Sequence, residues 1–556
     1  EDEDHDEHEE DMGFLANSDF GSTTSRFGVS RVGDWGYFGI SLEDQETAYG
    51  IPFHGDEHGD EHGDEHGDEH GDEDHGDEHG DEHEGERIYA FTDSQAVNLQ
   101  GSFNVNGSLV NSIDYFFRDT EYAFSEQHAE EHGDEHGDEH EGEDHDDHGH
   151  EEGPTVFSND ATEFGAIFDL KPFTNSHSSK IMFNFLEMDE AIVGAEAFMN
   201  PVQSEEFNIG YYLGTDLPGD FDLDLGVRYD SVNRKGSVTE HHEEEHHDDD
   251  HGDDDHGDEH EDEHHEMEEV FFDNTYEEYS FSASLRKQIN DSMSFDVSFS
   301  SVANAPSSTN LAMNGPHLAR GRFETGDVNL DPERGNNFEG TLFYDDGDFF
   351  GQFTLFQNSI SNYIYLQDEL EHMDEDHHDE DHGDEDHGDE DHDEHEGHDD
   401  HGGLIHADFL QQDADFNGYE FEFGRRFILA SGELELSFGR DVVNGEFSDG
   451  ENIPRITPAR NLYSLSYVAS DLRFNLTLKD VEAQKDIGDG ETTTDGYKML
   501  NLRVGKDYSL ASGNNLRVSV FANNILDEVA RNHASYVKDQ VPLPGVNFGV
   551  RFNLDF

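Results

Sequence analysis

Residues 221–229 read Phe-Asp-Leu-Asp-Leu-Gly-Val-Arg-Tyr, with an apolar side chain at every second position. The same alternation appears in residues 293–299, 472–479 and 547–556. A period of two is that of a β-strand, whose successive side chains point to opposite faces of a sheet. These stretches therefore predict strands with one apolar and one polar face, as in a soluble sandwich or in a barrel of the bacterial outer membrane.

The connections between the predicted strands favour the barrel. About nineteen strands are predicted between residues 22 and 556, and short and long connections alternate along the chain. The short ones carry turn-forming residues, as in Asn106-Gly107 and Pro218-Gly219-Asp220. Outer-membrane barrels have short periplasmic turns and long external loops, whereas a sandwich has no reason to sort its loops. We predict an all-β, antiparallel transmembrane β-barrel, in which three further strands would complete the plugged class of about 22.

Four of the long connections are runs of His, Asp, Glu and Gly, at residues 54–86, 127–152, 240–269 and 371–406. A fifth, partial run opens residues 1–21, and residues 22–556 are assigned to the barrel. Segments without apolar residues cannot bury a core, so solvated external loops are expected.

These runs hold 36 of the 39 histidines. Imidazole adds no charge at neutral pH, and its particular asset is nitrogen ligation of transition metals. We therefore predict capture of zinc or a similar divalent metal by many interchangeable ligand sets, against the alternative of a solvated acidic surface that binds calcium loosely. The candidate ligands are His54, His58, His62, His66, His70, His75, His79, His83, His132, His136, His140, His241, His242, His246, His247, His377, His378, His382 and His387.

One further candidate, His317, stands alone in a loop without a repeat, with Glu324 nearby. Either it is a surface histidine without a special role, or it is a discrete metal ligand at the mouth of the lumen that receives metal from the runs. His533 is a weaker candidate of the same kind.

Composition excludes several functional classes. A net charge of −108 argues against nucleic-acid binding, and the absence of cysteine rules out thiolate metal sites. No apolar stretch is long enough for a transmembrane helix. The spacing His-Glu-x-x-His occurs at residues 242–246 and 260–264 only within low-complexity runs, so no enzyme and no catalytic cofactor are predicted.

Several segments resemble one family, the TonB-dependent outer-membrane receptors, and within it the zinc-uptake type. They are Tyr49-Gly50-Ile51-Pro52 before a His-rich run, Asn314-Gly315-Pro316-His317, Asn524-Ile525-Leu526-Asp527, Pro542-Leu543-Pro544-Gly545 and the terminal Phe556. The resemblance implies an N-terminal plug that contacts the TonB complex, a plug this chain is expected to lack. It also implies an aromatic end read by the barrel-assembly machinery.

These observations together predict the barrel portion of a receptor in the outer membrane of a Gram-negative bacterium. Its partners would be divalent metal ions, membrane lipid and, through the plug, TonB. Two alternatives stay open: a surface barrel that buffers metal without transporting it, and a receptor for a metal chelate or siderophore.

Overall fold

The computed structural model describes residues 17–555 apart from 52–87, 129–153, 174, 195–196, 242–266, 318–319, 370–403 and 512. The described part is one sheet with a single short helix. Its elements are β1 (Phe20–Gly33), β2 (Gly36–Ile51), β3 (Ile88–Asn104), β4 (Val110–His128), β5 (Thr155–Leu170), β6 (Ser176–Val193), β7 (Met199–Leu217), β8 (Phe221–His241), β9 (Met267–Asn290), β10 (Met293–Asn304), α1 (Ser308–Ala312), β11 (Asn314–His317), β12 (Arg322–Thr325), β13 (Glu333–Asp345), β14 (Phe349–Asp368), β15 (Ile405–Leu429), β16 (Gly432–Phe447), β17 (Arg460–Ala469), β18 (Leu472–Val481), β19 (Tyr497–Ser509), β20 (Asn515–Asn523) and β21 (Asn547–Asp555).

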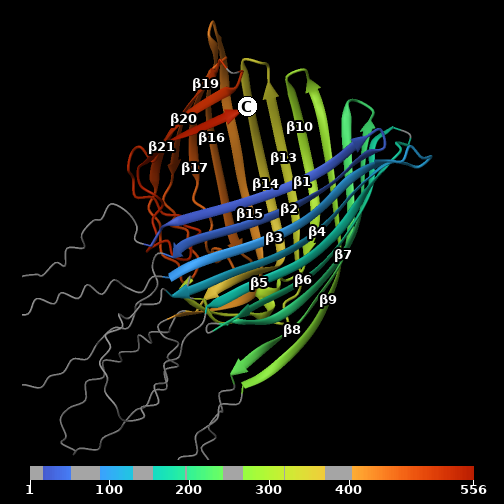
Figure 1. Ribbon diagram of the computed structural model, residues 1–556, viewed down its shortest axis with the longest axis vertical. Helices are drawn as coiled ribbons and strands as arrows, with labels where there is room; N and C mark the ends of the chain where they lie inside the picture. The colour runs from blue at the N-terminus through green and yellow to red at the C-terminus, as the bar shows by residue number, and fades with distance from the viewer. Residues whose placement is uncertain are drawn as a thin grey trace, which may run out of the picture.

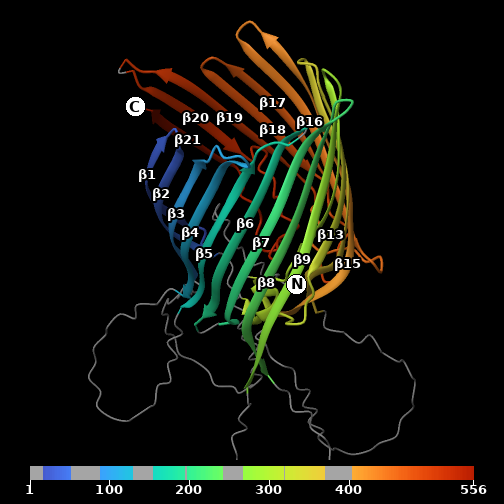
Figure 2. The same ribbon diagram turned by 90° about the vertical axis from the view of Figure 1, so that its right-hand side faces the viewer.

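The wall of the molecule is formed by nineteen of the 21 strands, each paired with its neighbours in chain order. The remaining two, β11 and β12, make a small hairpin inside the connection between β10 and β13, which pair directly with each other. The described strand pairs are antiparallel except for the parallel pair β12–β15. The wall curves into a barrel whose edge strands are β1 and β21 (Figures 1 and 2). The predicted fold class and the predicted number of strands are confirmed.

The apolar positions of the strands lie on the outer surface of this barrel. Val227, Phe423 and Phe552 are 57%, 55% and 68% exposed, whereas Arg234 and Ser280, from polar positions, are buried. A sandwich would bury the apolar face instead, so the orientation of these side chains excludes that alternative. In the described residues, no helix has the length and apolarity needed to cross a membrane.

The two ends of the barrel differ in their connections, as predicted. Short turns join β1 to β2, β3 to β4, β7 to β8, β9 to β10 and β15 to β16 at one end, the upper one in Figure 1. Asn106 and Asp220 adopt positive φ angles of 50° and 59° there, which asparagine and aspartate tolerate better than most residues. The four complete His-rich runs all join strands at the opposite end, hereafter the loop end. The runs themselves lie almost entirely outside the described residues.

The connection between β10 and β13 folds back against the inner surface of the barrel near the loop end. Helix α1 begins with a capping box between Ser307 and Asn310 and buries Leu311 completely. Leu311 joins Phe198, which precedes β7, and apolar residues of β7, β8 and β9 such as Val202 in the largest apolar cluster of the described structure. This cluster anchors the hairpin β11–β12, which carries His317.

Candidate functional site

The hairpin β11–β12 is placed by backbone contacts with the barrel wall. The Asn314 amide donates a 2.7 Å hydrogen bond to the Phe198 carbonyl, and the Asn314 side chain donates to the Thr239 carbonyl of β8. Gly315 has a φ of +150°, and a Cβ there would lie 2.7 Å from the Phe198 Cβ. A glycine is therefore required for β11 to approach Phe198, the residue before β7, so closely.

His317 ends β11 and points at a buried carboxylate. Its ring stacks on Phe198 with 5.1 Å between centroids, and its Nδ1 lies 3.2 Å from Glu324 Oε1. The geometry is not that of a hydrogen bond, so this buried nitrogen has no hydrogen-bond partner among the residues that the structure describes. The His317 side chain is 17% exposed and that of Glu324 is fully buried. Phe198 thus fixes the orientation of the His317 ring, and Nδ1 is available to bind a ligand.

The Glu324 carboxylate is neutralised by Arg320, whose Nη1 donates to both carboxylate oxygens at 3.0 and 3.3 Å. Burial by itself raises the pKa of Glu324, but the neighbouring His317 and Arg320 side chains outweigh it and leave the pKa lowered. The carboxylate is therefore ionised at neutral pH and faces the His317 Nδ1, which has no hydrogen-bond partner in the described part of the chain.

The separation of these two atoms suits a tetrahedral metal ion. A zinc ion with Zn–N of about 2.0 Å and Zn–O of about 2.1 Å holds two such ligands about 3.3 Å apart. His317 Nδ1 and Glu324 Oε1 are 3.2 Å apart. In the described part of the chain, no three or more His, Asp or Glu side chains converge on a metal position. The pair is thus a two-ligand arrangement whose other coordination positions need water or further ligands.

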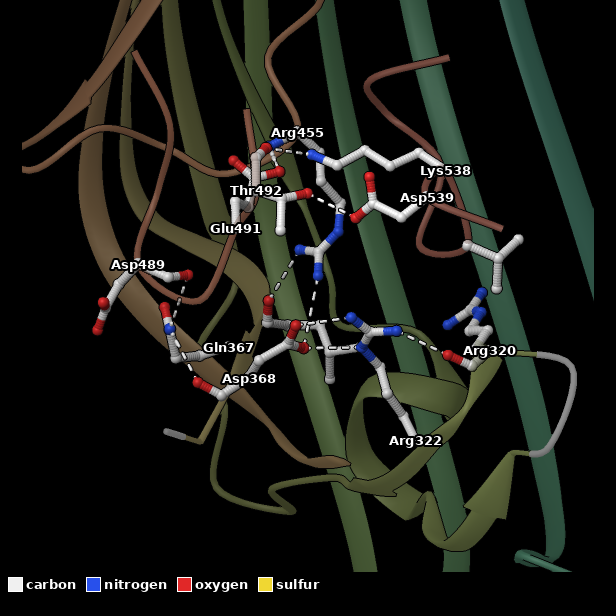
Figure 3. Close-up of polar contacts among 12 residues, drawn as sticks. Arg320, Arg322, Gln367, Asp368, Arg455, Asp489, Glu491, Thr492, Lys538 and Asp539 are labelled. Carbon is white, nitrogen blue, oxygen red and sulfur yellow. Dashed lines mark hydrogen bonds and ion pairs between the residues drawn. The ribbon is translucent and has the colours of Figure 1, made fainter. Parts of the chain in front are cut away.

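Beside this pair, three arginines surround one tyrosine ring. Arg320, Arg322 and Arg455 place their guanidinium carbons 5.0, 4.7 and 3.8 Å from the centre of the Tyr536 ring. Arg322 also makes a bidentate ion pair with buried Asp368, at 2.7 and 2.6 Å, and Figure 3 shows Arg455 turned toward the same carboxylate. The connection between β20 and β21, which carries Tyr536, is thereby held against the β11–β12 hairpin.

A second buried pair of a histidine and a carboxylate, His533 and Glu491, lies in the same region of the barrel. His533 is 2% exposed, and its Nε2, which has no hydrogen-bond partner within the described ranges, is 3.7 Å from Glu491 Oε1. Its Nδ1 is 2.8 Å from Thr494 Oγ1 and 3.3 Å from Lys538 Nζ. Burial lowers the pKa of Lys538, whose ammonium also donates to the Thr492 carbonyl at 2.6 Å (Figure 3).

The Glu491 carboxylate is held mainly by the backbone. Its oxygens accept hydrogen bonds from the Arg455 amide at 2.8 Å and the Gly488 amide at 3.0 Å. Burial raises the pKa of Glu491, but His533 and these two amides outweigh it and lower the pKa overall. Backbone amides and neighbouring side chains therefore hold both members of this pair in place.

The structure describes few of the predicted metal ligands. His317 is brought to Glu324 as its sequence position suggested, and His241 is the last residue of β8. The other candidates in the runs lie outside the described residues, so their role stays a prediction. His406, which ends the run at residues 371–406, is described, and its ring stacks on Phe323 with 4.9 Å between centroids.

Sequence reasoning did not identify the arginine cluster. Arg320 and Arg322 lie close to His317 in the sequence, and a chain with only 29 Lys and Arg residues rarely places two so close to a candidate ligand. That proximity was the one available signal. Asp368, Arg455 and Tyr536 are too distant in sequence to be recognised as neighbours.

Residues 12–525 match the model of the family described as TonB dependent receptor-like, beta-barrel. The fold is also similar to solved structures. The copper transporter OprC gives a TM-score of 0.59 at 10% identity, covering 97% of this chain and 81% of that one. The FrpB iron transporter from Neisseria meningitidis (F3-3 variant) gives 0.58 at 13%, covering 96% and 71%. The ferric yersiniabactin uptake receptor FyuA from Yersinia pestis gives 0.57 at 13%, covering 97% and 71%.

Proposed function

The chain belongs to the TonB-dependent receptor-like β-barrel family, whose members are outer-membrane receptors, and we propose that it takes up zinc or a similar divalent metal. The His-rich runs would lie outside the cell and capture the metal. The pair His317–Glu324 would then receive it at the mouth of the lumen, and passage inward would be driven through TonB.

The proximity of the runs to the His317–Glu324 pair is the observation that carries this proposal. The run at residues 240–269 begins at the end of β8, one residue after Thr239, whose carbonyl accepts a hydrogen bond from Asn314 of β11. The run at residues 371–406 begins three residues after Asp368, which pairs with Arg322 of β12, and ends at His406, which stacks on Phe323. Two of the runs are thus tethered within a few residues of the hairpin that carries both ligands.

The chemistry of the two components is complementary. The runs offer many imidazole and carboxylate ligands at high effective concentration, so a metal ion that leaves one ligand set meets another. Their negative charge also raises the local concentration of cations. In the part of the chain that the structure describes, the pair offers only two protein ligands, and a site with few ligands releases its ion more readily than a complete four-ligand site. Capture and transfer are therefore assigned to different parts of the molecule.

The test is a zinc-uptake assay on cells that carry the complete receptor, across a range of zinc concentrations, with surface-bound zinc counted in parallel. His317→Ala should lower uptake at limiting zinc and leave the amount of surface-bound zinc almost unchanged. Deletion of all five runs should abolish most surface binding, with uptake recovering as zinc is raised.

A matched control is His177→Ala at the opposite end of the barrel. His177 Nδ1 is also 3.2 Å from a carboxylate, Asp216 Oδ1, but the His177 side chain is 46% exposed and far from the runs in the topology. It should behave as wild type. If His317→Ala also behaves as wild type at every zinc concentration, the pair is not the transfer site. If neither variant nor the wild type transports zinc, the barrel only buffers metal.

A receptor for an anionic metal chelate is the second candidate, and the three guanidinium groups around Tyr536 favour it. Arginine donors suit carboxylate-rich carriers. Supplying zinc with and without an excess of citrate separates the two candidates. A receptor for the free ion loses uptake when citrate lowers free zinc, whereas a chelate receptor gains uptake.

A further inference from the structure

Glu324 is a fully buried carboxylate in a site that we propose to bind a cation. A buried charge needs a countercharge at all times, because leaving it unpaired is strongly unfavourable. Among the described residues, the guanidinium hydrogen-bonded to Glu324 is that of Arg320. Its neighbour Arg322 is committed to Asp368 through two hydrogen bonds. Arg320 therefore occupies the electrostatic position that an incoming metal ion would take.

We propose that Arg320 is a resident counter-ion that a divalent metal must displace from Glu324, so that Arg320 sets the affinity and the release of the ion. This inference rests on the proposed role of the His317–Glu324 pair. Arg320 is a positioning and specificity residue, because it acts through Glu324 and does not ligate the metal.

The distances make simultaneous occupancy unfavourable. Arg320 Nη1 lies 3.0 Å from Glu324 Oε1, the oxygen that is 3.2 Å from His317 Nδ1. A metal ion bound between Nδ1 and Oε1 would lie about 2 Å from each. The guanidinium would then share one carboxylate oxygen with a doubly charged ion, and repulsion between the two cations is strong in a buried environment.

The Arg320 side chain can move toward solvent when it leaves Glu324. Its side chain is 38% exposed, and the guanidinium already lies over the Tyr536 ring at 5.0 Å. Arg322 and Arg455 hold their positions through Asp368, so the ring stays in place while Arg320 moves toward solvent. The displaced guanidinium remains tethered four residues from Glu324 and returns as the metal departs.

This exchange gives the site two properties. A cation without strong affinity for imidazole and carboxylate does not displace Arg320, which selects for divalent transition metals over sodium or potassium. The returning guanidinium also competes with the bound metal, which accelerates its release toward the lumen.

The experiment measures zinc uptake by cells with the complete receptor carrying Arg320→Gln. Glutamine removes the charge and keeps a polar side chain. The half-saturating zinc concentration should fall about tenfold, since the competing charge is gone, and the maximal rate should fall because the ion is released more slowly. A merely structural role would lower the maximal rate without improving half-saturation.

Two further variants act as controls. Arg320→Lys keeps the charge and should restore values close to wild type. Arg334→Gln removes a guanidinium of similar exposure, 36%, that pairs with Glu278 of β9, and it should leave half-saturation unchanged.

The possible failures are distinguishable. If His317→Ala impairs uptake while Arg320→Gln leaves half-saturation unchanged or raises it, the displacement proposal is wrong and the proposed function stands. If His317→Ala is without effect, the site itself is wrongly assigned. Should Arg320→Gln be poorly folded, zinc-dependent thermal stabilisation of the purified receptor replaces uptake, and the variant must gain more stability from zinc than wild type does.

Discussion

The two buried His–carboxylate pairs of this barrel are alike in composition and different in their surroundings. In each, a buried imidazole nitrogen that has no hydrogen-bond partner among the described residues faces a buried carboxylate, at 3.2 Å for His317–Glu324 and 3.7 Å for His533–Glu491. In the first pair the carboxylate is neutralised by one partly exposed side chain, Arg320. In the second it is held by two backbone amides that cannot leave.

This difference shows how a histidine and a carboxylate can form either a ligand site or a structural contact. A ligand site needs a countercharge that is removable and a route for the ion, and Arg320 with the 17% exposed His317 provides both. A structural pair needs partners that stay in place, and Thr494 and Lys538 occupy the second nitrogen of His533. Proximity of histidine and carboxylate alone does not distinguish the two.

The largest expected effect that separates the pairs is on stability. His533→Ala removes a 2% exposed ring that contacts Lys538, Thr494 and Glu491, and should destabilise the connection between β20 and β21 by about 2–4 kcal/mol. His317→Ala should cost less than about 1 kcal/mol. Limited proteolysis of the purified receptor, with the cleavage site mapped between residues 524 and 546, measures both. Equal protection of the two variants would contradict the structural role of His533.

The next effect is a pH dependence, which should lower the zinc affinity of the receptor and leave the connection between β20 and β21 in place. Imidazole has an ordinary pKa of about 6.5, so zinc affinity of the receptor should fall at least about tenfold between pH 7.5 and pH 5.5. The pKa values of Glu324 and Glu491 are lowered from the ordinary value, so each carboxylate contributes stability above its unfolded-state pKa and loses it only as pH falls through the lower folded-state value. Both therefore stay ionised over this window.

Zinc and calcium titrations, run beside proteolysis at each pH, check this expectation. Calcium binding, which uses oxygen ligands alone, should change much less than zinc binding, and the connection between β20 and β21 should stay protected until about pH 4. Parallel loss of zinc and calcium would show that the histidines are not the ligands.

The smallest energetic effect is expected from probes of orientation, because both pairs should open toward the outside of the cell. The chain has no cysteine, so a single introduced cysteine reports its own accessibility. Asp489→Cys, exposed at the loop end near Glu491, should be labelled on intact cells by a membrane-impermeant reagent. Pro218→Cys, in the exposed turn between β7 and β8, should not, and each substitution should change stability by no more than about 0.5 kcal/mol. Labelling of the Pro218→Cys variant from outside would reverse the proposed orientation.

Local pattern determined most of the fold. The alternation in residues 221–229 and in the other strands was enough to predict which side chains face outward, since the period of a strand depends only on neighbouring residues. Turn residues such as Asn106 and Asp220 marked the short-turn end for the same reason. The hairpin β11–β12 was not separated from its loop, because strands of four residues carry too little periodicity.

The candidate site was predicted only in part from the sequence. The sequence by itself singled out His317 and showed Glu324 nearby in the chain. Only the tertiary structure decided that Glu324 is buried, that Arg320 neutralises it, and that Asp368, Arg455 and Tyr536 complete the assembly. Ion pairs and ring contacts act through space between segments far apart in the chain, and their formation depends on how the barrel closes around them. A local sequence pattern therefore cannot show which of these distant residues come into contact.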